Sequence, residues 1–144
     1  MQALPHRYYV CASAESEGDV TLKSDGLSNI SSDAPAEFGG PGDKWSPETL
    51  LMAAVADCFV LSFKAVAKAA KFDWLALDCR AEGKLDKQER KVCFTEFEVF
   101  VSLTVAADVD EEQATQLLEK AERNCLVANS LSGSSQLYIE ILRG

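Results

Sequence analysis

Two cysteines stand in unlike settings in this 144-residue chain and could together carry out redox chemistry. Cys58 lies in a long apolar run over residues 45–59, whereas Cys125 follows a charged segment and precedes the apolar residues 126–128. Neither cysteine belongs to a CxxC pair of the kind that binds a metal ion. If the fold brings them together, an oxidant can convert one thiol to a sulfenic acid, and the other can condense with it to a disulfide. Such a pair is what a two-cysteine peroxidase needs.

Several motifs in register with these cysteines resemble the OsmC/Ohr family, the osmotically inducible protein C and organic hydroperoxide resistance proteins. The matching features are the Gly39-Gly40-Pro41-Gly42 turn, the Ser46-Pro47-Glu48-Thr49-Leu50-Leu51 segment, Cys58 ten residues after Glu48, and Cys125 with Asn129-Ser130-Leu131 behind it. The order of elements is similar along nearly the whole chain. The resemblance implies an intertwined homodimer whose two active sites lie at the subunit interface.

The resemblance also implies a role for each site residue. Cys58 would be the peroxidatic thiol, Cys125 the resolving thiol, and Glu48 a carboxylate that helps to build the site. The implied substrates are organic hydroperoxides, and the implied reductant is a cellular dithiol, often a lipoyl group. No metal, flavin or haem cofactor is implied.

One departure from the hydroperoxide-resistance pattern concerns activation of the thiol. Those proteins carry an arginine in an early glycine-rich turn, where it pairs with the glutamate and polarises the peroxidatic thiol. The matching turn, residues 14–19, is acidic here and has no arginine. Arg7, Lys44 and Arg80 are candidate substitutes. The chain therefore resembles a divergent subgroup that is a weaker peroxidase, uses another activator, or binds a different ligand.

A structural interpretation competes with the catalytic one at each position. A cysteine in an apolar helix is usually an inert small hydrophobe, and both apolar surroundings and the adjacent Asp57 raise a thiol pKa. Glu48 could serve only as a first-turn carboxylate favoured by the helix dipole. It precedes Cys58 by about 15 Å along a helix axis, so a catalytic Glu48 is expected from the partner subunit.

The remaining candidate residues are expected to have no catalytic role. Cys11, Cys79 and Cys93 fall in strand patterns and are expected to be structural, and His6 is expected at the surface. Phe38, Trp45, Phe59 and Phe63 would form either an apolar pocket for an alkyl or aryl hydroperoxide or an ordinary core. The alternative function, from a different class, is a non-catalytic dimer that binds a hydrophobic small molecule at the interface.

Length and composition set broad limits on the protein. Residues 1–144 fit a single domain with its own core. The net charge of −9 and the pI near 4.6 disfavour nucleic acids and anionic membranes as partners. The first residues do not read as a signal peptide, and the longest apolar stretch contains Asp57, Lys64 and Lys68. We therefore expect a reducing, cytoplasmic location in which the five cysteines rest as thiols.

Periodicity and turn signals predict the order of elements. Strands are expected at about 7–14 and 18–24, a long loop at 28–43, a helix at 46–71 capped by Ser46, a hairpin of strands at about 74–86 and 91–106, a helix opening at Asp110, and a closing strand at 136–142. The fold class is therefore α+β, a mainly antiparallel sheet packed on a long central helix. Because that helix is apolar on most sides, a partner subunit is expected to cover part of it.

Overall fold

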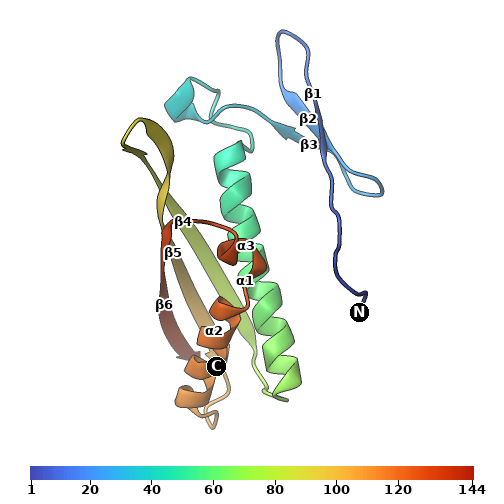
Figure 1. Cartoon of the computed structure of the whole chain (residues 1–144). Helices are drawn as coiled ribbons and strands as arrows, with labels where there is room; N and C mark the ends of the chain where they lie inside the picture. The colour runs from blue at the N-terminus through green and yellow to red at the C-terminus, as the bar shows by residue number, and fades with distance from the viewer. The chain divides into compact units, whose positions relative to one another are not determined.

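The computed structural model describes residues 1–144 and forms two compact units, Met1–Leu50 and Leu51–Gly144, each with a three-stranded sheet (Figure 1). The long helix α1 (Pro47–Ala69) begins in the first unit and continues through the second. Three of the four strand pairings are antiparallel. The predicted α+β class is confirmed, and the assignment of residues 1–144 to a single domain stays a prediction.

The first unit is a small antiparallel sheet in the order β1 (Cys11–Ser13), β2 (Val20–Lys23), β3 (Ile30–Ser32). Gly18 has a φ of 92°, in the left-handed region that glycine adopts easily, in the turn between β1 and β2. The prediction of an unstructured loop over residues 28–43 is wrong in part. The segment contains β3 and a 3-10 turn, η1 (Ala36–Phe38), because pairing with β2 imposes an extended backbone that the serine-rich sequence does not announce.

Helix α1 begins where the sequence predicted it to begin. The Ser46 hydroxyl oxygen accepts a hydrogen bond from the Thr49 backbone N–H at 3.1 Å, and Pro47 occupies the first helical position, where its missing N–H is harmless. The helix ends at Ala69, two residues before the predicted Lys71. Lys71 itself takes a φ of 55°, a left-handed conformation that stops the helix.

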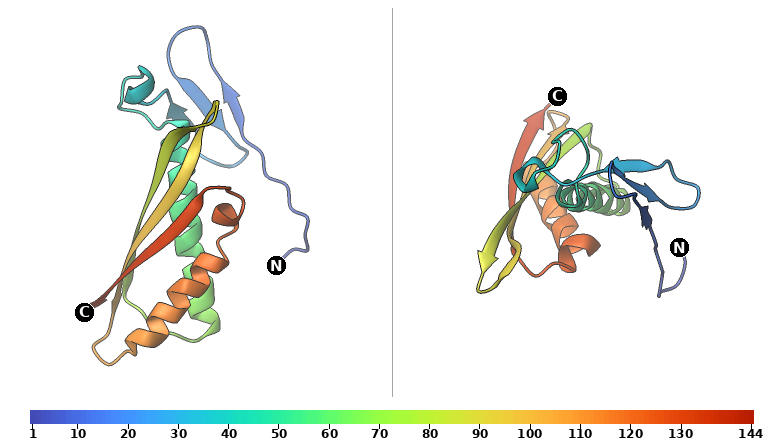
Figure 2. Two further views of the ribbon diagram at one scale, coloured as in Figure 1. Left: turned by 60° about the vertical axis from the view of Figure 1, so that its left-hand side comes forward. Right: turned by 90° about the horizontal axis from the view of Figure 1, so that it is seen from above.

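The second unit is built on a sheet in the order β4 (Ala76–Gln88), β5 (Lys91–Val105), β6 (Ser134–Arg143). Strands β4 and β5 form the predicted hairpin, whereas β6 runs parallel to β5. The connection between β5 and β6 contains α2 (Glu111–Arg123) and the short α3 (Leu126–Asn129) (Figure 2). Asp110 caps α2 as predicted, because its carboxylate accepts a hydrogen bond from the Glu112 N–H at 3.1 Å.

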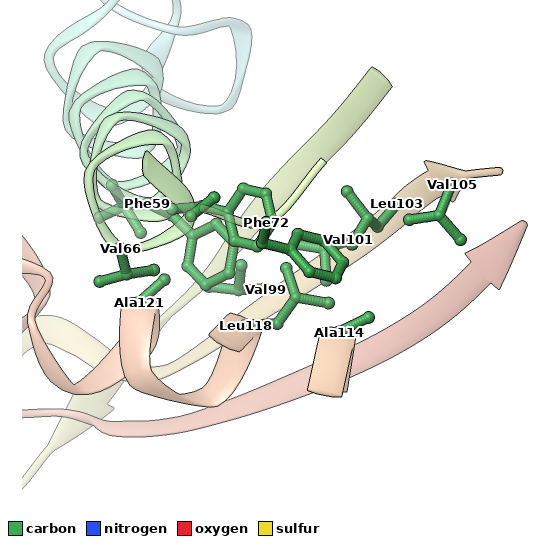
Figure 3. Packing of buried hydrophobic residues seen from close by; sticks show 13 residues of the cluster. Phe59, Val66, Phe72, Val99, Val101, Leu103, Val105, Ala114, Leu118 and Ala121 are labelled. Carbon is green, nitrogen blue, oxygen red and sulfur yellow. The ribbon is translucent and has the colours of Figure 1, made fainter. Parts of the chain in front are cut away.

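The hydrophobic core of the second unit lies where α1 and α2 pack on one face of this sheet (Figure 3). Its fully buried members include Phe59 and Phe63 of α1, Leu103 of β5 and Leu118 of α2. Burial of each such side chain stabilises the fold by roughly 1.5–3 kcal/mol. The first unit has no fully buried hydrophobic residue, and its two buried side chains are Ser32 and Ser46.

The composition and length of α1 would also suit a membrane span. A core helix of a soluble fold passes the same test, and Phe59, Phe63 and Val66 are buried in the core described above. The helix is therefore a core helix, and nothing in the structure places the chain in a membrane. Only 28% of an apolar 18-residue stretch of this helix is buried within one copy of the chain. Leu61, for example, is 56% exposed.

Candidate active site

The structure brings Cys58 and Cys125 together within the second unit. Cys58 lies in the middle of α1 and is partly exposed, whereas Cys125 is 2% exposed at the N-cap of α3. The two thiols are close enough for Cys58 to influence the ionisation of Cys125. Local structure holds Cys125 in place. Its backbone N–H donates to the carbonyl of Glu122 at 3.2 Å, and its own carbonyl accepts from the Asn129 N–H at 3.0 Å.

The electrostatic environment makes the two thiols unequal. The pKa of Cys125 is raised to about 11, mainly by burial, and the neighbouring Cys58 contributes to this increase through hydrogen bonding and charge. Hydrogen bonds from the backbone amides of Ala128 and Val127 lower the pKa of Cys125, but the net shift is upward. Cys125 is therefore protonated at neutral pH, and its S–H can serve as a donor toward the sulfur of Cys58. Cys58 is the thiol with solvent access.

A third thiol, Cys79, belongs to the same neighbourhood. Burial raises its pKa to about 11, and the charge of Cys125 adds to the effect. Sequence reasoning grouped Cys79 with Cys11 and Cys93 as structural, because all three fall in strand patterns. Cys11 is exposed in β1 of the first unit, and the Cys93 sulfur lies away from the cluster, 3.8 Å from the Gln88 amide oxygen at the far end of the hairpin. The available signal was the inward register that Cys79 shares with Leu77 and Ala81.

Glu48 lies in the first unit, in the first turn of α1, at the wall of a cavity of about 490 Å³. The other walls are mostly apolar, and they include Ala12, Val20, Leu22, Pro35, Phe38 and Leu50. The Oε1 atom of Glu48 is buried and has no hydrogen-bond partner. A buried carboxylate oxygen without a donor is costly. The position therefore calls for a donor from a ligand or from another chain.

Along α1, Glu48 and Cys58 do not meet. The helix is continuous between them, and ten residues correspond to about 15 Å of rise along its axis. This agrees with the expectation that a catalytic Glu48 does not serve the Cys58 of its own helix. Of the three residues proposed to be catalytic, the structure brings Cys58 and Cys125 together, and Glu48 lines a cavity of the first unit.

Two of the three candidate substitutes for the arginine are engaged elsewhere. Lys44 forms an ion pair with Asp19 at 3.1 Å, and this partner raises the pKa of the lysine. Arg80 pairs with Glu82 and follows the inward-facing Cys79 on β4, so strand alternation points it to the opposite face of the sheet. Arg7 is exposed and is the remaining candidate.

The four aromatic residues proposed as a pocket are divided between the two units. Phe59 and Phe63 are buried in the core of the second unit, as the alternative interpretation allowed. In the first unit, Phe38 lines the Glu48 cavity, and Trp45 lines a separate hollow together with Lys44 and Thr49. Aromatic side chains alone therefore did not identify the cavity.

Comparisons with known proteins identify the family. The family model described as OsmC-like protein matches residues 40–140, so the chain belongs to the OsmC-like family. The uncharacterized protein YmaD of Bacillus subtilis is 23% identical over 94% of this chain and 93% of its own length. An OsmC-like protein of unknown function from Vibrio cholerae has a similar fold, with a TM-score of 0.83, 20% identity, and coverage of 96% of this chain and 100% of the other. An organic hydroperoxide resistance protein from Elizabethkingia anophelis has a TM-score of 0.76 at 24% identity, covering 98% and 100% of the two chains.

Proposed function

We propose that the protein is a thiol-dependent peroxidase that reduces organic hydroperoxides. The observation that carries this proposal is the pairing of a partly exposed Cys58 with a buried, protonated Cys125. Membership of the OsmC-like family and the fold shared with an organic hydroperoxide resistance protein support the substrate class.

The reaction follows from the positions of the two thiols. The Cys58 thiolate attacks the distal oxygen of the hydroperoxide, the O–O bond breaks, and the alkoxide takes a proton and leaves as the alcohol. Cys58 is now a sulfenic acid. The Cys125 sulfur, after losing its proton, attacks the Cys58 sulfur and displaces the hydroxyl group as water, which forms a disulfide. Burial of Cys125 keeps it protonated and unreactive until a sulfenic acid appears beside it.

An external dithiol closes the cycle. One of its sulfurs attacks the Cys58–Cys125 disulfide, and its second sulfur releases the mixed disulfide, so the dithiol leaves oxidised and both protein thiols return. We expect a cellular dithiol such as a lipoyl group in this role. A cytoplasmic location, where the five cysteines rest as thiols, fits such a reductant.

We further propose a homodimer in which Glu48 of one chain serves the Cys58 of the other. The unpartnered Glu48 oxygen, the exposed hydrophobic residues of the first unit and the incompletely buried α1 support this arrangement. Light scattering at micromolar concentration should give about twice the chain mass of 15.6 kDa. A stable, folded monomer under these conditions would count against the dimer.

The decisive test of the function is mass spectrometry of peptides after one equivalent of cumene hydroperoxide. The expected product is a Cys58–Cys125 disulfide, with one cumyl alcohol formed per chain. Free thiols should be alkylated before digestion so that the other cysteines are counted in the same sample. Recovery of Cys58 and Cys125 as alkylated thiols with the hydroperoxide intact would overturn the proposal.

A second candidate function is the binding of a hydrophobic small molecule without catalysis. The apolar cavity beside Glu48 and the engagement of Lys44 and Arg80 with other carboxylates favour it. Thiol titration separates the two functions. A Cys58 that reacts quickly with a thiol reagent in the folded protein supports the peroxidase, and a Cys58 that reacts only after denaturation supports the binding protein.

A further inference from the structure

We propose that Cys79 is a third redox thiol, which takes over the disulfide from Cys58 by attacking the sulfur of Cys125. The inference rests on the proposed peroxidase function and extends it. It assigns a task to a residue that lies on the inner face of β4, outside the pair that forms the first disulfide.

The strand register places Cys79 toward the other two thiols. Along β4 the partly buried positions alternate with exposed ones, and Leu77, Cys79 and Ala81 all pack against the core. Cys79 pairs with Val101 of β5, which is itself buried in that core. The helices that carry Cys58 and lead to Cys125 cover the same face of the sheet. All three sulfurs are therefore on one side of the sheet.

The packing of α1 on β4 sets the height of Cys79 along the helix. Residue 83 is a glycine, and a Cβ atom there would lie 2.8 Å from the Met52 methyl carbon, so helix and strand approach closely at this point. Strand and helix run in opposite directions (Figure 1). From that contact, Cys58 lies about 9 Å further along α1 toward its C-terminus. Cys79 lies about 13 Å back along β4 toward its N-terminus. Because the two elements are antiparallel, both displacements have the same direction. Cys58 and Cys79 thus lie at similar positions along the axis of α1.

The proposed step is a thiol–disulfide exchange within one chain. The Cys79 thiol loses a proton, and its sulfur attacks Cys125 in the Cys58–Cys125 disulfide. The Cys58–Cys125 bond breaks as the Cys79–Cys125 bond forms, and the departing Cys58 sulfur takes up a proton. No oxidant or reductant is consumed, because one disulfide replaces another.

The consequence is that Cys58 becomes free while the chain is still oxidised. A second hydroperoxide molecule can then oxidise Cys58 to a sulfenic acid before any external dithiol arrives. One chain would consume two equivalents of hydroperoxide instead of one. Because burial keeps Cys79 protonated, the exchange should be slower than formation of the first disulfide.

The test adds cumene hydroperoxide to the reduced protein in two successive equivalents, with dimedone present during the second. The expected result is a Cys58–Cys125 disulfide first, then a Cys79–Cys125 disulfide, and finally chains that carry this second disulfide together with a dimedone adduct on Cys58. Persistence of the Cys58–Cys125 disulfide with Cys79 recovered as a free thiol would overturn the exchange and leave the peroxidase function standing.

A matched pair of variants assigns the effect to Cys79. Cys79→Ala should lower hydroperoxide consumption without reductant from two equivalents per chain to one, and the dimedone adduct should disappear. Cys93→Ala removes another strand cysteine that lies away from the cluster, and it should keep both equivalents. Equal consumption in the two variants would contradict the proposal.

A separate oxidation tests the geometry without relying on hydroperoxide. In Cys58→Ser, the thiol oxidant diamide should join Cys79 to Cys125, because these two remaining thiols of the cluster are near enough for the charge of Cys125 to act on Cys79. Absence of this disulfide would overturn the inference whatever the outcome with hydroperoxide. If the disulfide forms but hydroperoxide fails to oxidise Cys58 in the unaltered protein, the peroxidase function and the exchange sequence both fall.

Discussion

The two units of the molecule differ in how they treat their hydrophobic side chains. The second unit buries a continuous core of phenylalanine, leucine, valine and alanine residues. The only buried residues of the first unit are two serines, and the unit exposes many of its large hydrophobic side chains. Those exposed by more than half are Leu4, Tyr8, Tyr9, Val10, Leu27, Phe38 and Trp45, in addition to Met1.

Because of this contrast, the thiol pair and Glu48 differ in whether they need a second chain. The thiols sit on a unit that supplies its own core, so their pairing can be completed within one chain. Glu48 sits on a unit with an apolar surface and an unpartnered buried oxygen. Exposed apolar surface of this kind marks an interaction site in a soluble protein. We infer that redox chemistry is intrinsic to the second unit, whereas the role of Glu48 depends on assembly.

The largest effect is expected from loss of the attacking thiol. Cys58→Ser should reduce hydroperoxide consumption to the uncatalysed background, because an alcohol at this position cannot form a sulfenic acid. Consumption is measured by loss of cumene hydroperoxide in the presence of a dithiol. A variant that keeps substantial turnover would show that another cysteine is the primary nucleophile.

Replacing the resolving thiol should stop the cycle later. Cys125→Ser is expected to complete one turnover per chain and then to stall with Cys58 as a sulfenic acid, which dimedone traps and mass spectrometry detects. Cys125 is buried, so circular dichroism should confirm that the variant is folded. Loss of turnover equal to that of Cys58→Ser, with no trapped adduct, would contradict the assigned order of the two thiols.

The difference in packing between the units can be tested by truncating one leucine in each. Leu118→Ala removes a fully buried side chain from α2 and should lower the free energy of unfolding by about 2–5 kcal/mol. Leu27→Ala removes a side chain that is 69% exposed in one chain, so on the packing of a single chain it should change the free energy of unfolding by less than about 0.5 kcal/mol. Denaturation by urea measures both values. Equal losses of unfolding free energy in the two variants would contradict the difference in packing between the two units.

Mixed dimers test whether Glu48 acts on the other chain. If it does, a heterodimer of Glu48→Ala and Cys58→Ser chains has one site damaged twice and one intact site. About half of the normal activity per heterodimer should return, although each parent homodimer is impaired. Activity no higher than the average of the two parents would indicate that Glu48 acts within its own chain or serves only the helix dipole.

The last effect concerns stability at high pH. The pKa values of Cys79 and Cys125 are raised to about 11 in the folded chain, compared with 9.0 for an ordinary thiol. Between these values the unfolded state loses protons that the folded state keeps, so the free energy of unfolding falls as pH rises from 9 to 11. The double variant Cys79→Ala, Cys125→Ala should show a shallower fall in urea denaturation. Below pH 9 the two proteins should have parallel profiles.

Local signals in the sequence predicted the elements well. The Ser46-Pro47 start of α1 and the Asp110 cap of α2 were recognised because each depends on side chains within three residues. The hairpin of β4 and β5 was recognised from its alternation. The similarity in motif spacing located Cys58, Cys125 and Glu48, and their catalytic roles stay predictions.

Long-range pairing explains what the sequence did not reveal. The parallel alignment of β6 with β5 depends on partners distant in the chain, and the inclusion of residues 30–32 in a strand depends on pairing with the preceding strand β2. The same holds for Cys79, because it comes close to Cys125 only when the sheet and the connection between β5 and β6 have formed. No local spacing could indicate that three cysteines on three different elements would become neighbours.

The position of Cys125 in the crossover between two parallel strands also affects how strongly oxidation constrains the unfolded chain. Cys58 and Cys125 are 67 positions apart, and β4, β5 and α2 all lie between them. A disulfide that closes a loop of this length lowers the entropy of the unfolded chain, which corresponds to about 4 kcal/mol of stabilisation in the chain-entropy model. The oxidised protein is therefore expected to melt at a higher temperature than the reduced one. Heat resistance would then report the redox state of the molecule, and a chain that had just met an oxidant would be its most durable form.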